Sequence, residues 1–333
     1  MQAFGLSLLP IRLARLAATA VFLGLTALAS AQAQDRGSSP IKLVVPYGAG
    51  GPTDVVARLI SVRLQNILQQ PVVVENRAGA GSAIGARLVA KAAPDGQTIL
   101  VGNVSTFALV PATLKAPGYD PTKSFAPLLQ LTDMASVMVT PSDFPANTVA
   151  EFVRYAKAHP GKISYGSAGV GNSAHLLGEM IKARAGIDIV HVPYKSGSEM
   201  SMAVMAGQVQ FGITDLSASL QQIRDGRLKA LAVTGLARHP EFPQVQTMIE
   251  AGYPDIVLRN WTGAAVPAGT PPATVKRLEA ALNEILKSPD YKAAIAKLGG
   301  EATPGTSEEF GALVAAEYKK WGEVAKAAGV SID

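Results

Sequence analysis

Short apolar runs alternate with amphipathic runs along most of the chain. The apolar runs are four or five residues long and rich in Val and Ile, which is typical of strands. They predict strands over residues 41–45, 72–75, 98–102, 136–140, 163–166, 189–192, 209–213, 230–233 and 262–266. The amphipathic runs predict helices over residues 54–68, 82–92, 149–159, 174–185 and 199–205. This alternation predicts βαβ units, and therefore parallel sheets covered by helices.

The strands fall into two α/β sections, which predict two lobes with a cleft between them. One section covers about 41–103 and the other about 136–233, and residues 111–131, rich in Pro, Lys and Gly, predict a surface connection. We expect lobe 1 to hold 40–130 and 237–333 and lobe 2 to hold 131–236. The last third predicts helices over 271–298 and 307–328, of which 261–298 fits either lobe.

The first 33 residues predict a signal peptide. Arg12 and Arg15 precede an apolar run of 13 residues, 17–29, and a small-x-small cleavage site ends at Ala33. A membrane anchor is the alternative, but the run is shorter than the roughly 20 residues that span a bilayer. Without a Cys after the run, a lipoprotein is excluded. We therefore expect an exported protein that begins at Gln34.

Composition excludes several classes of site. The chain has no Cys, so it has neither disulfides nor thiolate metal ligands. Its formal charge of +5 becomes +3 once Arg12 and Arg15 leave, and the basic residues are scattered, which argues against nucleic acid binding. The four His residues have no metal-ligand spacing, and we expect no metal and no cofactor.

A glycine turn after the first strand predicts an anion site. Residues 46–54, PYGAGGPTD, lead from that strand into a helix, where free N–H groups and the helix dipole attract an anion without any arginine. The candidate binding residues are Tyr47, Gly50, Gly51 and Thr53. We expect Thr53 or Asp54 to cap the helix and Asp54 to fix the loop. The alternative is a plain strand-to-helix loop.

A second turn of the same design, residues 165–175, follows the strand at 163–166. Its candidate binding residues are Ser167, Gly171, Asn172, Ser173 and His175. The stretch also matches a dinucleotide fingerprint, with Asp188 as the acidic residue, but an exported chain lies outside the compartment of nicotinamide cofactors. A hydrolase would use Ser167 or Ser173 with His175, but Tyr165 occupies the place of the glycine in G-x-S-x-G.

Polar residues at other strand ends predict the walls of the site. Ser105 and Thr106 follow the strand at 98–102, and Asp215 follows the strand at 209–213. A carboxylate such as Asp215 in an anion site must face a donor, which a ligand hydroxyl, a ligand amino group or a water would provide. Capping of the helix after Leu216 is the alternative for Asp215. No residue is expected to be catalytic.

Seven motifs resemble one family along essentially the whole mature chain. They are PYGAGGPTDVVAR at 46–58, VENRAGAG at 74–81, YDPTKSFAP at 119–127, GSAGVGNSAH at 166–175, VPYK at 192–195, LAVT at 231–234 and PAGTP at 267–271. In this order they resemble the Bug family, the periplasmic solute receptors of tripartite tricarboxylate transporters. The resemblance implies an α/β, two-lobed type II periplasmic binding protein fold with a ligand cleft between the lobes.

The resemblance also implies a function. It predicts a monomeric solute-binding protein, not an enzyme, that captures a small carboxylate and presents it to membrane permease subunits. Three positions depart from the family pattern: Asn172 replaces Ser or Thr, Ser196 precedes Gly197, and Thr262 replaces an aromatic residue. A secreted serine hydrolase, and a sensor that signals to a membrane receptor, are the alternatives. The sequence does not identify the carboxylate.

Overall fold

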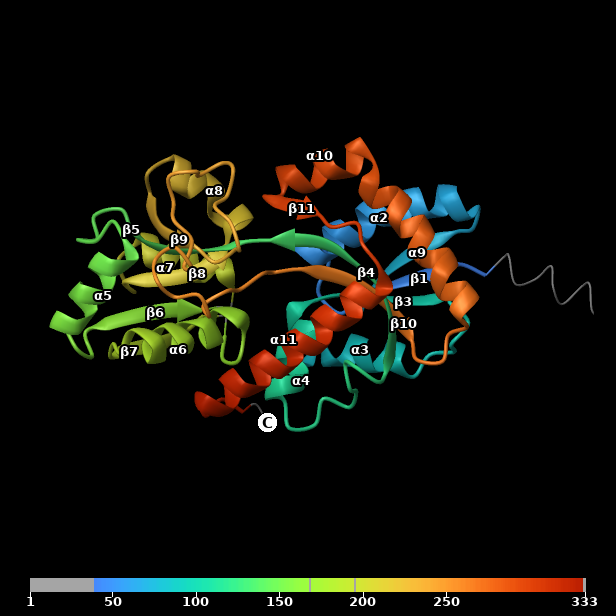
Figure 1. Ribbon diagram of the computed structural model, residues 1–333, viewed down its shortest axis with the longest axis horizontal. Helices are drawn as coiled ribbons and strands as arrows, with labels where there is room; N and C mark the ends of the chain where they lie inside the picture. Colours follow the sequence, from blue (N-terminus) through green and yellow to red (C-terminus); the bar gives the residue numbers. More distant parts are fainter. Residues whose placement is uncertain (1–38, 168, 195, 332–333) are drawn as a thin grey trace, which may run out of the picture.

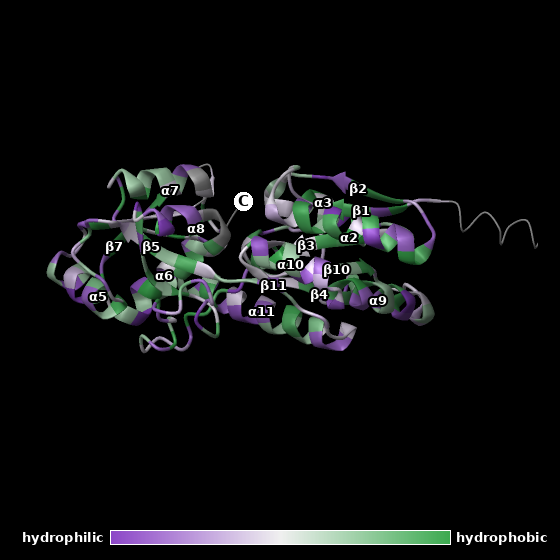
Figure 2. Cartoon of the chain, turned by 90° about the horizontal axis from the view of Figure 1, so that it is seen from above, coloured by the Kyte–Doolittle hydropathy of each residue, from purple (hydrophilic) through white to green (hydrophobic). Residues whose placement is uncertain are grey.

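The protein consists of two α/β lobes that lie side by side, each built on one sheet (Figures 1 and 2). The computed structural model describes residues 39–331, apart from residues 168 and 195. The predicted signal segment, residues 1–33, lies outside the described residues. Among those described, no helix combines the length and the apolar character needed to cross a membrane. The predicted two-lobed α/β architecture is confirmed.

The first lobe contains the strands that carry the first glycine turn. Its strands are β1 (Ile41–Val45), β2 (Val72–Asn76), β3 (Thr98–Asn103), β4 (Phe125–Met134), β10 (Thr262–Pro267) and β11 (Gly300–Ala302). They lie in the order β11-β4-β10-β3-β1-β2. Because β1, β2 and β3 run parallel, their carboxyl ends meet at one edge of the sheet.

Helices cover both faces of this sheet. One face packs against α2 (Pro52–Leu68), α9 (Pro272–Lys287) and α10 (Pro289–Lys297); the other packs against α3 (Ala83–Ala90), α4 (Val110–Thr113) and α11 (Ser307–Ala327). Alternate residues of β1 point to opposite faces of the sheet. Leu43 packs in the core under α2, α9 and α10, and Val44 packs in the core under α3, α4 and α11. The helix predicted over 271–298 is divided, because Ser288 and Pro289 start α10.

The second lobe repeats the arrangement with the second glycine turn. Its strands are β5 (Ser136–Pro141), β6 (Ile163–Ser167), β7 (Ile189–Pro193), β8 (Phe211–Asp215) and β9 (Leu228–Val233). They lie in the order β7-β6-β8-β5-β9. Its helices are α5 (Val149–Ala158), α6 (Ser173–Ala185), α7 (Gly197–Met205) and α8 (Leu216–Arg224). Here β6, β7 and β8 run parallel.

Not all strands are parallel, and here the prediction was wrong. β10 runs antiparallel to β3 and β4, and β5 runs antiparallel to β8 and β9. β4 continues into β5 through Ala135, so the chain that crosses between the lobes runs against the parallel strands of the second sheet. The stretch 111–131, predicted as a surface connection, contributes most of β4, with Leu128, Leu129 and Leu131 buried.

The chain crosses between the lobes twice, and the two crossings touch. Ala135 in the first crossing forms an isolated β-bridge with Arg259 in the second. Before that point, residues 235–258 pack on the second lobe, where Thr247 pairs with Val233 at the end of β9. Residues 237–258 were predicted to belong to lobe 1, but they pack on the second lobe, where Phe242 and Val245 fill the core beside β9.

The C-terminal helix α11 extends from the first lobe toward the second (Figure 1). Its capping box confirms the predicted start: the Thr306 hydroxyl accepts from Glu309 N, and the Glu309 carboxylate accepts from Thr306 N. Trp321 and Ala325 near its end are buried in the core shared with α6 residues. The helix therefore connects the two lobes in addition to the crossings.

Candidate ligand-binding site

The first half of the site is the loop between β1 and α2, which we call the first cradle (residues 46–54). α2 begins at Pro52, with Gly51 at the N-cap and no side-chain cap in the described structure. The prediction that Thr53 or Asp54 caps the helix is wrong, because Pro52 has the φ value of a first helical residue and needs no N–H partner. The N–H groups of Thr53 and Asp54 have no carbonyl partner within the helix and point out of its positive end.

Asp54 holds this loop together. Its carboxylate accepts from Gly50 N (2.8 Å), from Arg58 Nε (2.9 Å) and from Asn76 Nδ2 (2.9 Å). Asn76 also donates to the carbonyl oxygen of Tyr47 (3.1 Å). The bond from Arg58 is the main reason that the pKa of Asp54 is lowered to about 2. The predicted fixing role of Asp54 is confirmed, and the Gly50 N–H is used inside the loop.

Tyr47 links the first cradle to the end of β3. Its hydroxyl donates to Asn103 Oδ1 and lies 2.8 Å from Thr106 Oγ1. Asn103 Oδ1 also accepts from Ser105 N (3.0 Å), and the Tyr119 hydroxyl donates to the Thr106 carbonyl (2.6 Å). Burial raises the pKa of Tyr47 to about 12, so the phenol stays neutral. The wall therefore offers uncharged polar groups.

A strained segment lies beside Tyr47, and the sequence analysis did not single it out as part of the site. Gly79, Ala80, Gly81 and Ser82 all have positive φ, which is unusual for Ala80 (46°) and Ser82 (118°). The Ser82 hydroxyl is buried near the Tyr47 hydroxyl but makes no well-formed hydrogen bond to a described residue. In the sequence, the two glycines at positions 79 and 81 were the indication of this positive-φ segment.

The second half of the site is the loop between β6 and α6, which we call the second cradle (residues 167–175). Asn172 caps α6 by accepting from His175 N (2.8 Å), so the departure from Ser or Thr preserves the cap. Gly171 N donates to His175 Nδ1 (2.9 Å), which places the proton of the neutral ring on Nε2. The Gly171 N–H is therefore used inside the loop. The Ser173 N–H, at the first helical position, lies at the positive end of α6.

Two histidine rings support the second cradle. The rings of His175 and His191 stack with their centroids 3.9 Å apart. His191 Nε2 lies 2.7 Å from Ser167 Oγ, and Ser167 is also hydrogen bonded to Gly169. Burial, and secondarily the neighbouring His175, lowers the pKa of His191 to about 4; burial also lowers the pKa of His175. Both rings are neutral at neutral pH.

This geometry does not favour the hydrolase alternative in which Ser167 is the nucleophile. Ser167 contacts His191 and not His175, and its side chain is fully buried. The nearby acid, Glu179, accepts from the Tyr165 hydroxyl (2.8 Å) and has no described bond to His191. A nucleophile needs an exposed oxygen and an oriented base. Ser167 is therefore part of the internal support of the loop.

Asp215 lies at the end of β8, against the second crossing. Its carboxylate accepts from Asn260 Nδ2, and the same amide donates to Ser136 Oγ (2.8 Å). Asp215 is the N-cap residue of α8, but its side chain makes no cap bond in the described structure, so the capping alternative is wrong for the side chain. Burial raises the pKa of Asp215, against the smaller effect of Asn260.

The structure brings the predicted residues together in two groups. The first cradle and the end of β3 gather Tyr47, Gly50, Gly51, Thr53, Ser105 and Thr106. The second cradle gathers Ser167, Gly171, Asn172, Ser173 and His175. The sequence analysis did not select the residues that support them, Asn76, Ser82, Asn103, His191 and Asn260. Asn76 and Asn103 both end parallel strands of the first sheet, a position that signals proximity to a ligand.

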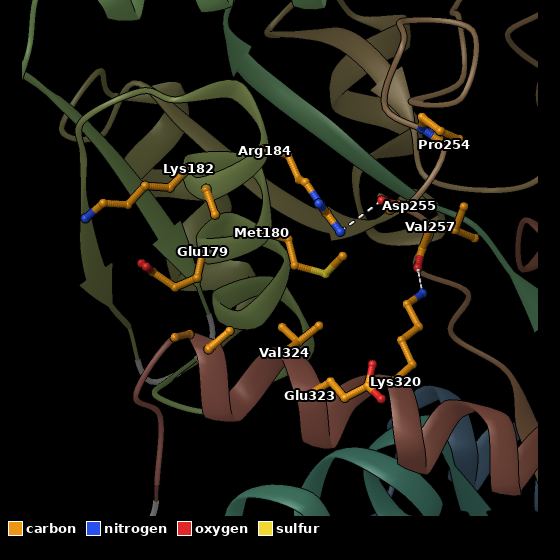
Figure 3. A pocket seen from close by; sticks show the side chains of 13 residues that line it. Glu179, Met180, Lys182, Arg184, Pro254, Asp255, Val257, Lys320, Glu323 and Val324 are labelled. Atoms are coloured by element: carbon orange, nitrogen blue, oxygen red, sulfur yellow. Dashed lines mark hydrogen bonds and ion pairs between the residues drawn. The ribbon is translucent and has the colours of Figure 1, made fainter.

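A cavity of about 880 Å³ lies elsewhere, between α6, residues 254–257 and α11 (Figure 3). Arg184 pairs with Asp255 (2.9 Å), and Lys320 Nζ donates to the Val257 carbonyl (2.6 Å). None of the predicted site residues lines it. Among the described residues, no group of His, Cys, Asp or Glu has the arrangement of a metal site.

The chain was compared with protein families. Residues 56–330 match the family described as "Tripartite tricarboxylate transporter family receptor". The chain belongs to this family. This match confirms the resemblance to the Bug receptors. The family is one of solute-binding receptors and not a family of enzymes.

Curated relatives match this tripartite tricarboxylate receptor over most of its length. A protein encoded between tcbD and tcbE in Pseudomonas sp. strain P51 is 37% identical over 285 residues, which cover 85% of this chain and 84% of the relative. BugT of Bordetella pertussis is 33% identical over 319 residues, which cover 95% and 98%. Both matches therefore extend over most of each chain.

Solved structures of related receptors have the same fold. The periplasmic binding protein BugD is 36% identical with a TM-score of 0.74, over 88% of this chain and 98% of BugD. A protein of R. palustris with adipate is 32% identical with a TM-score of 0.77, over 88% and 98%. MatC of Rhodopseudomonas palustris, with bound malate, is 32% identical with a TM-score of 0.74, over 86% and 98%.

Proposed function

We propose that this receptor captures a small organic acid between its two cradles. The main support is that two helix starts, those of α2 and α6, follow glycine turns at strand ends in different lobes. Each start directs N–H groups and a positive dipole end toward an anion. The structures of R. palustris relatives with adipate and malate support a carboxylate as the ligand.

Binding would be coupled to closure of the lobes about the two crossings. A ligand that contacts both cradles favours the closed arrangement, because the open arrangement offers it contacts on one side only. The closed receptor would then present a surface that the membrane permease distinguishes from the empty form. We infer a monomer that works in the periplasm, exported by residues 1–33, with no catalytic step.

A thermal unfolding screen tests the proposal. The mature chain from Gln34 is first unfolded and refolded to remove any co-purified ligand, and is then heated with dicarboxylates, tricarboxylates, acidic amino acids and aromatic acids, with their amides as controls. A ligand present at 100 times its Kd adds about 2.7 kcal/mol to the free energy of unfolding. We expect one class of acid, and not its amide, to raise the Tm by several degrees. Absence of any shift across the panel contradicts the proposal.

A further inference from the structure

Asp215 is a carboxylate at a site proposed for anions. The side-chain amide of Asn260 is its described partner, and both hydrogens of that amide are already used, one by Asp215 Oδ1 and one by Ser136 Oγ. Asp215 Oδ2 has no hydrogen bond to a described residue, and the charged groups that shift the other carboxylates of this chain, such as Arg58 beside Asp54, have no counterpart here among the described residues. One lone-pair face of Asp215 is therefore left for a donor from outside the protein.

The second crossing places Asp215 next to the wall of the first lobe. Asn260 contacts Asp215, and the following residue, Trp261, accepts from Val104 N through its carbonyl (3.1 Å). Val104 lies between Asn103 and Ser105, the residues that surround the Tyr47 hydroxyl. The Leu216 N–H also donates to the carbonyl of Ala135, in the first crossing (3.1 Å). Asp215 thus lies beside the two crossings, where the chain passes from one lobe to the other.

Electrostatics determines what can lie against such a carboxylate. Asp215 is half-buried, so a ligand carboxylate at this point would repel it in a partly dehydrated site, and an apolar carbon would cover its free oxygen without offering a donor. A hydroxyl or ammonium group satisfies the oxygen and forms a charge-assisted hydrogen bond. A site that hydrogen-bonds such a group discriminates strongly against analogues that lack it.

We propose that Asp215 selects ligands with a donor group, accepting a hydrogen bond from a hydroxyl or ammonium group on the carbon chain of the acid. The ligands are then hydroxy- or amino-dicarboxylates, and plain dicarboxylates bind more weakly. This inference rests on the proposed function, because it assumes that an acid binds between the cradles.

Calorimetric titration of the refolded wild-type protein with matched acids tests the inference. The pairs differ by one hydroxyl: succinate and malate, glutarate and 2-hydroxyglutarate, adipate and 2-hydroxyadipate, with 2-methoxysuccinate as a ligand of similar shape without the donor and aspartate as the amino ligand. We expect the hydroxylated member of the pair with the best length to bind at least about tenfold more tightly than its plain partner, and malate to bind more tightly than 2-methoxysuccinate. Equal Kd values overturn the inference alone, whereas no binding by any acid overturns the proposed function.

A variant separates ligand contact from support of the hinge. Asp215→Asn makes the acceptor neutral and removes the repulsion, so the ratio of the two Kd values should fall by at least about fivefold, with the plain acid bound as well as before or better. Asp225→Asn, an exposed carboxylate bonded to Gln221 just after α8, is the matched control and should leave the ratio unchanged. An equal loss for both acids indicates a structural role and overturns the inference. The methyl ether comparison decides the question if Asp215→Asn does not fold.

Discussion

The ring of His175 stacks on the ring of His191 within the second cradle, 3.9 Å from centroid to centroid. Each ring also makes a hydrogen bond within the second cradle: His175 Nδ1 accepts from the Gly171 N–H, and His191 Nε2 is hydrogen bonded to Ser167 Oγ. Protonation of His175 at Nδ1 would remove an acceptor, and a charge on either ring would face the other ring. The cradle therefore keeps its shape only while both rings are neutral.

We predict that the receptor loses stability in weak acid through this pair. The pKa of His191 is about 4 in the native state, against 6.5 for an unperturbed histidine. The unfolded chain thus binds the proton first, and the free energy of unfolding decreases as the pH falls from 6.5 to 4 and changes no further through this group below pH 4. Allowing for partial exposure, the loss is about 1–2 kcal/mol.

Thermal unfolding between pH 7 and pH 4 measures this effect. His191→Gln should reduce the pH dependence of the Tm, because glutamine does not titrate. His159→Gln, at an exposed histidine just after α5, should keep the wild-type slope. Identical slopes for the wild type and His191→Gln would contradict the prediction.

Asp54→Asn is expected to loosen the first cradle. The side chain of Asp54 is 2% exposed and accepts three hydrogen bonds, one of them from Arg58, which an amide cannot reproduce. We expect a loss of about 1–2 kcal/mol in urea unfolding and a weaker affinity for the ligand, since Gly50 is released. The native pKa of Asp54, about 2, lies below its usual value, so its contribution is present above about pH 4 and is lost as the pH falls toward 2.

The control for this variant is Asp143→Asn, which changes an exposed carboxylate in the turn after β5. It should leave both the unfolding free energy and the affinity unchanged. A similar loss in both variants would mean that the net charge, and not the Asp54 bonds, is responsible.

Thr234→Val tests the hinge. The buried Thr234 hydroxyl accepts from Ser136 N (3.1 Å) and donates to the Leu258 carbonyl (2.6 Å), so it joins the two crossings. Valine has the same shape but leaves both backbone groups without this partner, and we expect a loss of about 2–3 kcal/mol in urea unfolding. Thr140→Val on β5 is the control, because that hydroxyl is buried without a described partner and its removal should be neutral or stabilising.

Two helical glycines should respond to alanine in opposite directions. A Cβ at Gly178 in α6 would lie 2.1 Å from Cε2 of Tyr165, so Gly178→Ala must displace a buried ring and should destabilise the protein by about 1–3 kcal/mol. Gly322 in α11 has open space around it, and Gly322→Ala should stabilise the protein by about 0.5–1 kcal/mol. Equal effects in thermal unfolding would contradict this packing.

The sequence predicted the parts of the fold that depend on local pattern. The runs that form β1 and β6, the glycine turns and the capping box at Thr306 are all local signals, and each is present. The antiparallel direction of β10 and the strand β4 were missed, since both depend on where the chain crosses between lobes. Pro127 argued against a strand in the sequence, but β4 accommodates this proline next to a shift in its register with β10.

For the site, the sequence located the two loops, but it did not show which backbone N–H groups are hydrogen bonded inside them. The N–H groups of Gly50 and Gly171 were expected to face a ligand, yet Asp54 and His175 accept them. These partners are four residues further along the chain in both loops, so the spacing alone could have indicated them. The bond between His191 and Ser167 joins residues 24 positions apart, and only the pairing of β6 with β7 brings them together.

The position of β10 has a consequence for how the polypeptide acquires its shape. β10 lies between β3 and β4, although it begins at Thr262 and β4 ends at Met134. Until residues 262–267 arrive, β3 and β4 each present an unpaired edge to any other chain nearby. The second lobe is contiguous in sequence and can fold early, whereas the first lobe must wait for the end of synthesis. Pairing over such sequence distances is slow, and we therefore expect the folding chain to expose these strand edges, which favour aggregation, until β10 is in place.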